Sequence, residues 1–299
     1  MIKQPPYLKK GDKVAIVCPA KYLPKPIDFA IAKLKEWGLE VLIGDSVSAI
    51  HHQFAGDDTL RSNDLQKYLD DPEVKAIIAG RGGYGTIRII DMLDFTAFKA
   101  NPKWIVGFSD ITVLICHLLA KLNTQSIHGQ MPYTFDDATP ESLESLRKVL
   151  FGEPTIYTYE SHSKNRTGEA EGILIGGNLT LLTMLEGSDS APDYTDKILF
   201  IEDVGEHEYS IDRMMRMLKR SGRLANLKGL VIGALNEIEP EKIPFGQTPE
   251  EIISDIVKEY NYPVCFDFPT GHISDNRAMV IGAVIRLNVS DFKTELYGF

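Results

Sequence analysis

Cysteine is scarce in this sequence, and no cysteine is spaced for a disulfide framework or a zinc site. Cys18, Cys116 and Cys265 are the only three among 299 residues, and each lies in an apolar stretch. Zinc sites usually contain closely spaced pairs such as Cys-x-x-Cys, whereas small secreted domains carry many more cysteines. The pattern therefore predicts buried thiols in a reducing compartment, with neither disulfides nor a metal site.

Long apolar runs are also missing. No segment approaches the roughly 18 uninterrupted apolar residues that a membrane-spanning helix needs. The first apolar run, Val14 to Val17, is too brief for the core of a signal peptide. We therefore expect no membrane partner, and the cytoplasm is the default location.

Basic clusters are absent as well. The formal net charge is -10 and the isoelectric point is near 5.2. The densest basic stretch, Arg213 to Arg223, is typical of the polar side of one amphipathic helix. Because nucleic-acid binding needs a basic patch, we expect no nucleic-acid partner.

What the sequence does contain is the composition of an ordinary globular protein, with 43% hydrophobic and 25% charged residues. From Lys13 to about Leu122, short β-rich apolar runs alternate with longer helical segments. This alternation is typical of an open parallel sheet flanked by helices. The predicted fold class is thus α/β, with a Rossmann-like or flavodoxin-like amino-terminal domain.

A polar segment between Phe135 and Gly168 separates this pattern from the rest of the chain. We predict an amino-terminal domain over 1–135, a linker over 136–168 that includes a helix at 140–150, and a smaller, β-rich mixed α/β domain over 169–299. A capping box at Thr248 and Glu251 marks the start of one of its helices. Its predicted strands are Gly172–Ile175, Ile198–Ile201, Gly229–Leu235, Val264–Phe268 and Met279–Asn288.

The stretch "GFSDIT", Gly107 to Thr112, lies between a predicted strand and a predicted helix. A strand, a tight turn and a helix form the geometry that presents a nucleophile at a helix amino terminus. The stretch is not the G-x-S-x-G elbow, however, because Ile111 stands where the second glycine would be. Since serine is also a favoured helix cap, the local sequence leaves two alternatives for Ser109, a nucleophile or a cap.

The stretch "AGRGGYG", Ala79 to Gly85, again follows a predicted strand and precedes a helix. Its backbone N–H groups are suited to hold a phosphate or an oxyanion. Its spacing fits neither the dinucleotide-binding fingerprint nor the P-loop, so a structural turn is the default alternative and the loop by itself is weak evidence of a binding site. Both this loop and "GFSDIT" are predicted at the carboxyl ends of strands, where open α/β sheets bind ligands.

Two further strand ends carry titratable side chains. Glu202 follows four apolar residues, and a carboxylate leaving a buried strand usually has a partner. Glu202, Asp203 and His207 allow a metal-cluster alternative, although the familiar metal-binding spacings are absent and a solvated loop explains 206–208 as well. His272 lies in a loop after Pro269, where a lone histidine is usually just exposed.

Six segments, taken in order, resemble the LD-carboxypeptidase family of serine peptidases over nearly the whole chain. They are "FAGDDTLRSNDLQKYLDDPEVKAIIAGRGGYGTIRIID", "WIVGFSDITVL", "IHGQMP", "EGILIGGNLTLL", "LFIEDVGEHEYSIDRMM" and "GHISDN". The resemblance implies an active site between two domains, with a Ser-Glu-His triad at Ser109, Glu202 and His272. It also implies an oxyanion hole formed by the backbone N–H of Asp110 and of a glycine in "RGGYG", for which we choose Gly83.

The sequence departs from the family at two places that concern the substrate. The first predicted strand ends in "CPAKY" where a Pro-Ser turn is frequent in the family, and "HGQMP" has Gln130 where proline is frequent. An exopeptidase also needs a cation or a nest of N–H groups for the free carboxylate of its substrate. We name Arg81 as the candidate for this role.

The resemblance implies removal of the terminal D-alanine from murein tetrapeptides during cytoplasmic cell-wall recycling, with a small muropeptide as partner. It further implies no cofactor and a homodimer. One alternative is the related branch that resembles microcin C immunity hydrolases, which cut peptidyl or aminoacyl adenylate analogues. The alternative from a different class is a non-hydrolytic phosphate- or nucleotide-binding α/β protein, in which the glycine loop holds a phosphate and Ser109 only caps.

Overall fold

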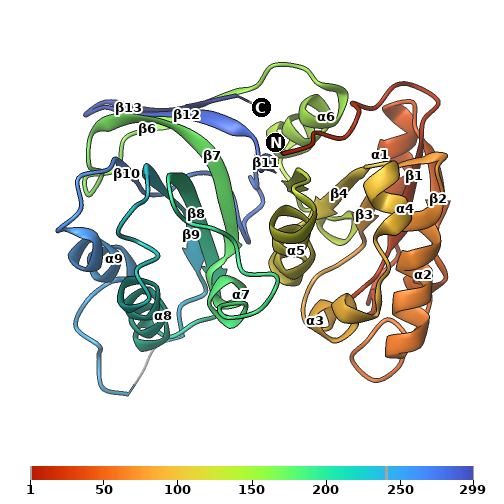
Figure 1. Cartoon of the computed structure of the whole chain (residues 1–299), viewed down its shortest axis with the longest axis horizontal. Coiled ribbons are helices and arrows are strands. Elements are labelled where there is room, and N and C mark those ends of the chain that lie inside the picture. Colours follow the sequence, from red (N-terminus) through yellow and green to blue (C-terminus); the bar gives the residue numbers. More distant parts are fainter. Residues whose placement is uncertain (1, 240–241, 299) are drawn as a thin grey trace.

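Two β-sheets organise the chain in the computed structural model, which describes residues 2–239 and 242–298 (Figure 1). The first sheet has six strands in the order β11-β5-β4-β3-β1-β2. Its strands are β1 (Lys13–Val17), β2 (Glu40–Ile43), β3 (Val74–Ala79), β4 (Trp104–Gly107), β5 (Ser126–His128) and β11 (Met279–Ile281). All its pairings are parallel except that of β11 with β5. The order β2-β1-β3-β4-β5 is that of a flavodoxin-like doubly wound sheet, which confirms the predicted α/β class.

The helices of this half are α1 (Asp28–Glu36), α2 (Asp58–Asp70), α3 (Thr86–Ile89), α4 (Thr96–Ala100), α5 (Thr112–Leu122) and α6 (Pro140–Phe151). Side-chain caps fix where several of them begin. The carboxylate of Asp57 accepts the N–H of Leu60 at the start of α2, and the hydroxyl of Thr139 accepts the N–H of Ser142 at the start of α6. Such caps satisfy backbone donors that have no partner within the helix.

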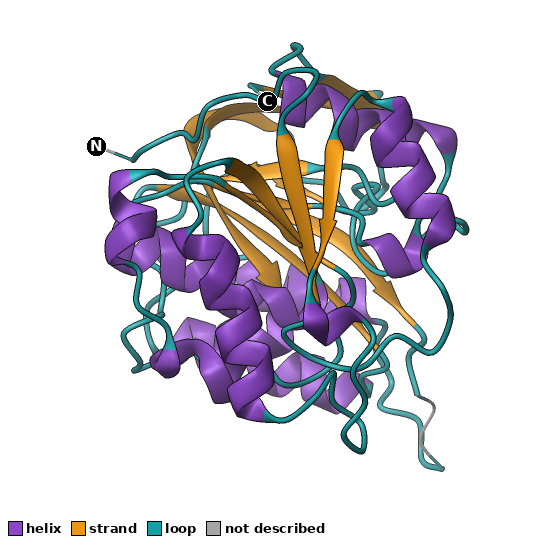
Figure 2. Cartoon of the chain, turned by 90° about the vertical axis from the view of Figure 1, so that its right-hand side faces the viewer, coloured by secondary structure: helices purple, strands orange, loops and turns teal. Residues whose placement is uncertain are grey.

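The second sheet has seven strands in the order β10-β9-β8-β7-β12-β13-β6. Its elements are β6 (Ile156–Glu160), β7 (Gly168–Asn178), β8 (Lys197–Val204), β9 (Gly229–Asn236), β10 (Val264–Cys265), β12 (Val284–Val289) and β13 (Lys293–Tyr297), with helices α7 (Leu179–Met184), α8 (Glu208–Arg220) and α9 (Pro249–Val257). The predicted capping box of Thr248 and Glu251 opens α9. Figure 2 shows the helices gathered around the strands.

The predicted strand Met279–Asn288 is wrong as a single element, because its two parts belong to different sheets. β11 pairs with β5 in the first sheet, whereas β12 pairs with β7 and β13 in the second. The chain turns between them at Gly282, whose φ of 94° is in the region that favours glycine. A continuous apolar run does not reveal this break, since both parts have buried faces. The carboxyl-terminal segment therefore ties the two sheets together.

The segment 136–168, predicted as a linker, contains α6 and the edge strand β6, which pairs with β13. The division into domains at this segment stays a prediction. Helix α5 lies in the middle of the molecule and packs against both β5 and β7 (Figure 1). At its start, the hydroxyl of Thr112 accepts the N–H of Asn178 at 3.2 Å, so α5 joins the two sheets near their carboxyl ends.

The three cysteines are buried free thiols, as predicted. Across 2–239 and 242–298, every helix is too short or too polar to span a lipid bilayer. The core of each half contains strand residues that are almost fully buried, such as Ile105 and Val106 in β4 and Leu199 and Phe200 in β8. Burial of each such side chain contributes roughly 1.5–3 kcal/mol.

The close approach of β7 to β8 predicts that Gly176→Ala destabilises the fold strongly. Gly176 has φ 132°, and a Cβ there would lie 1.8 Å from the carbonyl oxygen of Phe200. Backbone strain and overpacking each cost about 1–3 kcal/mol, so we expect the free energy of unfolding in urea to fall by about 3 kcal/mol. Gly187→Ala is the matched control, because Gly187 has φ 83° but no atom within 4 Å. Equal losses in both variants would contradict the prediction.

Candidate active site

The turn after β4 holds Ser109 in a conformation that serine rarely adopts. Its φ is 63°, and it begins the short 3₁₀ turn η3 (Ser109–Ile111) that leads into α5. No side chain caps η3 or α5, and the residue at the cap position of α5 is Ile111. The hydroxyl of Ser109 therefore caps no helix, and that alternative is wrong. A left-handed backbone at a non-glycine residue costs about 1–3 kcal/mol, and such strain concentrates at functional sites.

The neighbouring Asp110 ties this turn to the glycine loop. Its carboxylate accepts the N–H of Thr86 at 2.8 Å, at the end of the loop that follows β3. Burial raises the pKa of this carboxyl group, and the hydrogen bonds from Thr86 oppose that shift. On the other side of the loop, the buried guanidinium of Arg61 donates to the carbonyl of Gly85 at 3.0 Å. A Cβ at Gly82 would lie 2.9 Å from the Cβ of Ser109, so the loop is held directly against the serine.

A break in the second sheet frees the end of β8 around Glu202. The register between β8 and β9 shifts between Ile201 and Asp203. In place of a regular ladder there, the N–H of Ala234 in β9 donates to the carbonyl of Thr270 at 2.9 Å. Such irregularities change the direction of side chains next to active sites. The loop that contains Thr270 is thereby brought beside the carboxylate of Glu202.

His272 in this loop is the partner of Glu202. Its Nδ1 lies 2.7 Å from Oε2 of Glu202, whose side chain is fully buried. A Cβ at Gly271 would lie 3.0 Å from the Cβ of Glu202, so the loop backbone covers the carboxylate closely. A buried carboxylate without such a partner is strongly unfavourable. The expectation that Glu202 has a partner is therefore confirmed.

Two asparagines hold the His272 loop in place. Oδ1 of the buried Asn276 accepts the N–H of Gly271 at 2.9 Å and the hydroxyl of Thr270 at 2.8 Å. At the end of β9, Nδ2 of Asn236 donates to the carbonyl of His272 at 2.9 Å. Neither asparagine could be predicted from the sequence, because their role depends on backbone groups that no side-chain pattern reveals.

The electrostatic surroundings of His272 favour its protonated form. Burial lowers the pKa of this imidazole, but the hydrogen bond that it donates to Glu202 and the negative charges of Glu202, Asp203 and Glu237 raise the pKa above its ordinary value. In the neutral ring, a proton on Nδ1 shared with Glu202 leaves Nε2 free to accept a proton. This arrangement suits a general base whose cation is stabilised.

The imidazole of His272 also lies against the turn that contains Ser109. The rings of His272 and Phe108 meet edge to face with their centres 4.9 Å apart, and Phe108 directly precedes Ser109. The structure thus places His272 against Glu202 and against Phe108, the residue before Ser109. Ser109 follows β4 of the first sheet, Glu202 lies near the end of β8 of the second, and His272 lies in the loop after β10.

The end of β5, defined here as the joint segment His128–Gln130, contacts all three parts of this arrangement. The ring of His128 packs between those of Phe108 and Phe200, with centres 5.7 Å and 4.9 Å away. Complete burial lowers the pKa of His128 to about 4, so the ring is neutral at neutral pH. The N–H of Gly129 donates to the carbonyl of Gly107, two residues before Ser109, at 3.2 Å.

Gln130 completes the joint segment. Its Nε2 donates to the carbonyl of Ser274 at 3.1 Å, two residues after His272, and its Oε1 accepts the hydroxyl of Thr134 at 2.5 Å. The departure from the family pattern at this position therefore connects the first sheet to the His272 loop. The unusual Gln130 in "HGQMP" was the signal in the sequence, but its partner was not predictable from it.

The remaining predicted residues have other contacts. The guanidinium of Arg81 donates to the carbonyl of Tyr22 at 2.9 Å and lies over the ring of Tyr133. The imidazole of His207 is turned to Glu239, with Nδ1 2.8 Å from its carbonyl. Over the described ranges, no group of three or more His, Cys, Asp or Glu side chains is arranged to hold a metal ion.

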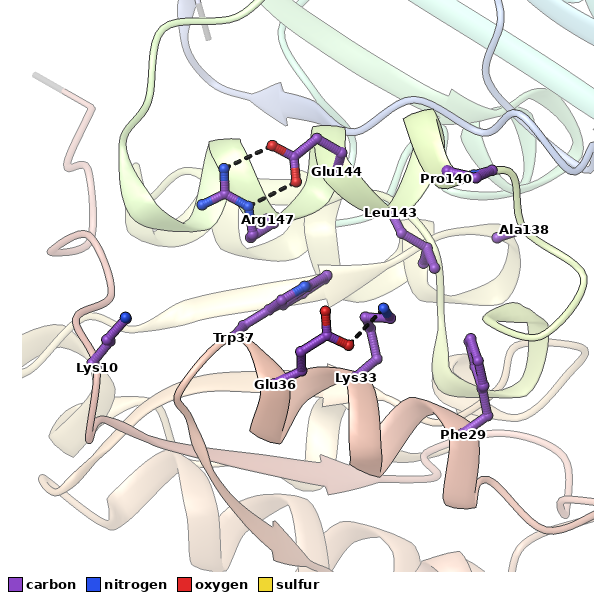
Figure 3. A pocket seen from close by; sticks show the side chains of 10 residues that line it. All are labelled: Lys10, Phe29, Lys33, Glu36, Trp37, Ala138, Pro140, Leu143, Glu144 and Arg147. Carbon is purple, nitrogen blue, oxygen red and sulfur yellow. Dashed lines mark hydrogen bonds and ion pairs between the residues drawn. The ribbon is translucent and has the colours of Figure 1, made fainter.

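A pocket of about 500 Å³ between α1 and α6 lies apart from these residues (Figure 3). Phe29, Trp37 and Leu143 contribute its apolar surface. Its charged residues pair with one another, Lys33 with Glu36 and Arg147 with Glu144, each at 2.7 Å. No member of the Ser109, Glu202 and His272 group lines it, so it is not the reaction centre.

Comparison with known proteins assigns the chain to a family. The model described as the LD-carboxypeptidase N-terminal domain matches residues 14–129, and that of the LD-carboxypeptidase C-terminal domain matches residues 171–287. A probable murein peptide carboxypeptidase of Bacillus subtilis is 36% identical over 96% of this chain and 92% of its own length. The chain belongs to the LD-carboxypeptidase family. The prediction of a serine-type carboxypeptidase is thereby confirmed over that of a non-hydrolytic phosphate-binding protein.

Other members of the LD-carboxypeptidase family resemble the chain over most of its length. The crystal structure of muramoyltetrapeptide carboxypeptidase from Oxalobacter formigenes has 32% sequence identity and a TM-score of 0.86, and the match covers 96% of this chain and 98% of that one. The microcin C7 self-immunity protein of Escherichia coli is 25% identical over 85% of this chain and 83% of its own length. The likeness to the first structure supports the two-sheet arrangement described above.

The contacts of Gln130 predict that Gln130→Ala lowers the reactivity of Ser109 without unfolding the protein. Loss of the bond to Ser274 lets the His272 loop shift relative to the serine. A displacement of about 1 Å can cost up to about a hundredfold in rate, so we expect labelling by a fluorophosphonate to slow about tenfold. Gln125→Ala is the control, because Gln125 also bonds a carbonyl across the same sheet junction, that of Gly282, at 3.3 Å. Similar slowing in both variants would contradict a specific role for Gln130.

The carboxylates around His272 predict a raised pKa for its imidazole. By NMR, its pKa should lie above the ordinary value of 6.5 and should fall in Glu202→Gln, which removes the charge but keeps the burial. Because the folded pKa is raised, the stabilisation from this pair is complete below the unfolded pKa and is lost as pH rises through the folded one. Glu239→Gln, at the neighbouring His207, should leave the titration of His272 unchanged. An unaltered pKa in Glu202→Gln would refute the assignment of the cause.

Proposed function

We propose that this LD-carboxypeptidase hydrolyses the peptide bond before the terminal D-alanine of murein tetrapeptides, through an acyl-enzyme on Ser109. The observation that carries the proposal is the buried pair of Glu202 and His272, 2.7 Å apart, whose imidazole lies against the Phe108–Ser109 turn. The names of the relatives, which refer to murein peptides and muramoyl tetrapeptides, support the substrate class.

In the first step, His272 accepts the proton of the Ser109 hydroxyl as the oxygen attacks the carbonyl carbon before the terminal residue. Glu202 orients the imidazole and stabilises its cation. The protonated His272 then donates its proton to the nitrogen of the departing D-alanine. Water, deprotonated by the same imidazole, attacks the acyl-enzyme and releases the shortened peptide.

The charge that develops on the carbonyl oxygen needs preorganised donors, and we assign this role to the N–H groups of Gly83 and Asp110. Asp110 lies in the first turn of η3, where N–H groups have no acceptor within the helix. Gly83 is exposed and directly follows Gly82, the glycine held against Ser109, and its N–H has no acceptor among the residues that the structure describes. Each such donor contributes about 10²–10³-fold in comparable sites.

The family resemblance also implies a homodimer and a cytoplasmic location, and the composition argues against a nucleic-acid partner. These stay predictions. The microcin-type substrate is the competing possibility for the same site, because the Escherichia coli self-immunity protein is a more distant relative over most of the chain.

The decisive test is turnover of a murein tetrapeptide, followed by mass spectrometry of the released D-alanine. Ser109→Ala should lower kcat by at least about a thousandfold, because the hydroxyl is the nucleophile. Ser274→Ala is the control, since this exposed serine on the His272 loop contributes only its backbone carbonyl. Full turnover by Ser109→Ala would refute the mechanism. Release from an aminoacyl sulfamoyl adenylate but not from the tetrapeptide would refute the proposed substrate.

A further inference from the structure

Several cations surround the carboxyl ends of β1 and β3, and nearly all are already paired. Arg61 and Arg88 both bind the carboxylate of Asp58. Lys25 lies 2.7 Å from the carboxylate of Asp136. Arg81, our candidate from the sequence, donates to the carbonyl of Tyr22 and stacks on Tyr133.

Lys21 differs from these neighbours. Across 2–239 and 242–298, no carboxylate pairs with its ammonium group and no acceptor binds it. The side chain is only partly buried, so the charge keeps its hydration and needs no internal partner. It is the stretch "CPAKY", one of the departures from the family pattern, that contributes this residue.

The stem of Lys21 lies directly over the glycine loop. A Cβ at Gly83 would lie 2.5 Å from Cδ of Lys21, and the N–H of Lys21 faces the carbonyl of Gly82 at 3.4 Å. The loops after β1 and β3 also meet at the point where a flavodoxin-like strand order reverses, which is the usual ligand crevice of such sheets. The ammonium group is two bonds beyond Cδ, so it is within reach of the assigned oxyanion hole.

The negative charges near His272 restrict where the carboxylate of a substrate can bind. Glu202, Asp203 and Glu237 surround His272, and their negative charges raise its pKa. A carboxylate placed near them would be repelled. In the substrate, the terminal carboxylate is three bonds from the carbonyl carbon that Ser109 attacks, which is within reach of a lysine beside Gly83. We infer that the Lys21 ammonium binds the terminal carboxylate and so selects peptides that end at the residue to be removed.

This inference rests on the proposed function, and its test compares two substrates. One is a murein tetrapeptide with a free terminal carboxylate, and the other is the same peptide with a terminal amide. Lys21→Met keeps the stem over Gly83 and removes the charge. Charge-assisted bonds of this kind are worth a factor of about 10 to 100, so kcat/KM for the free acid should fall by that factor, mainly through KM. The amide should be cleaved about equally by both proteins, and Lys21→Arg should restore much of the preference for the acid.

Controls distinguish a failure of the proposed function from a failure of the role assigned to Lys21. Lys25→Met removes a neighbouring lysine that is already paired, and it should keep the preference for the acid. Labelling of Ser109 by a fluorophosphonate, which has no carboxylate, should proceed at the wild-type rate in Lys21→Met and so report an intact fold. If the wild type cleaves no tetrapeptide, the proposed function fails. If the wild type prefers the acid and Lys21→Met prefers it equally, or if Arg81→Met alone removes the preference, the role of Lys21 is refuted.

Discussion

A fully buried carboxylate must have a compensating partner, and the structure around Glu202 follows from this requirement. The partner is His272, and it reaches Glu202 only because the ladder between β8 and β9 is interrupted and the backbone at Gly271 lies against the carboxylate. The free groups of β9 bind the arriving loop in place of β8, with Ala234 donating to Thr270. The need to compensate the buried charge of Glu202 thus accounts for the break between β8 and β9, the close packing of Gly271 and the fixed position of the His272 imidazole.

The second constraint is that Ser109, beside the first sheet, and Glu202, in the second, must keep fixed positions relative to each other. After His272 the chain enters β11, leaves the second sheet and pairs with β5 of the first. The joint segment His128–Gln130 at the end of β5 contacts the residues beside Ser109, Glu202 and His272. The pairing of β11 with β5 and the bonds of the joint segment therefore hold the His272 loop to the first sheet. A site supported by rigid elements is held more closely than one on free loops.

Much of the fold and of the site could be predicted from the sequence, because the signals are local. Each strand of the first sheet is an apolar run followed by a turn, and Ser109, Glu202 and His272 each follow such a run. The pairing of β11 and β12 with different sheets could not be predicted, since both have the same buried pattern. Asn236 and Asn276 were missed for a related reason, because they act on backbone groups of segments that are distant or irregular.

The sequence by itself determined the α/β class, the family and the residue types that carry the chemistry, since strand and helix periodicity and ordered motifs are properties of neighbouring residues. The local sequence around Ser109 left open whether this residue caps a helix, and the sequence named Arg81 as the cation for the substrate carboxylate. Only the tertiary structure shows that Ser109 caps no helix and that Arg81 is already bound. Whether a side chain is free or already bound depends on what the rest of the chain places around it, as Tyr22 and Tyr133 do for Arg81.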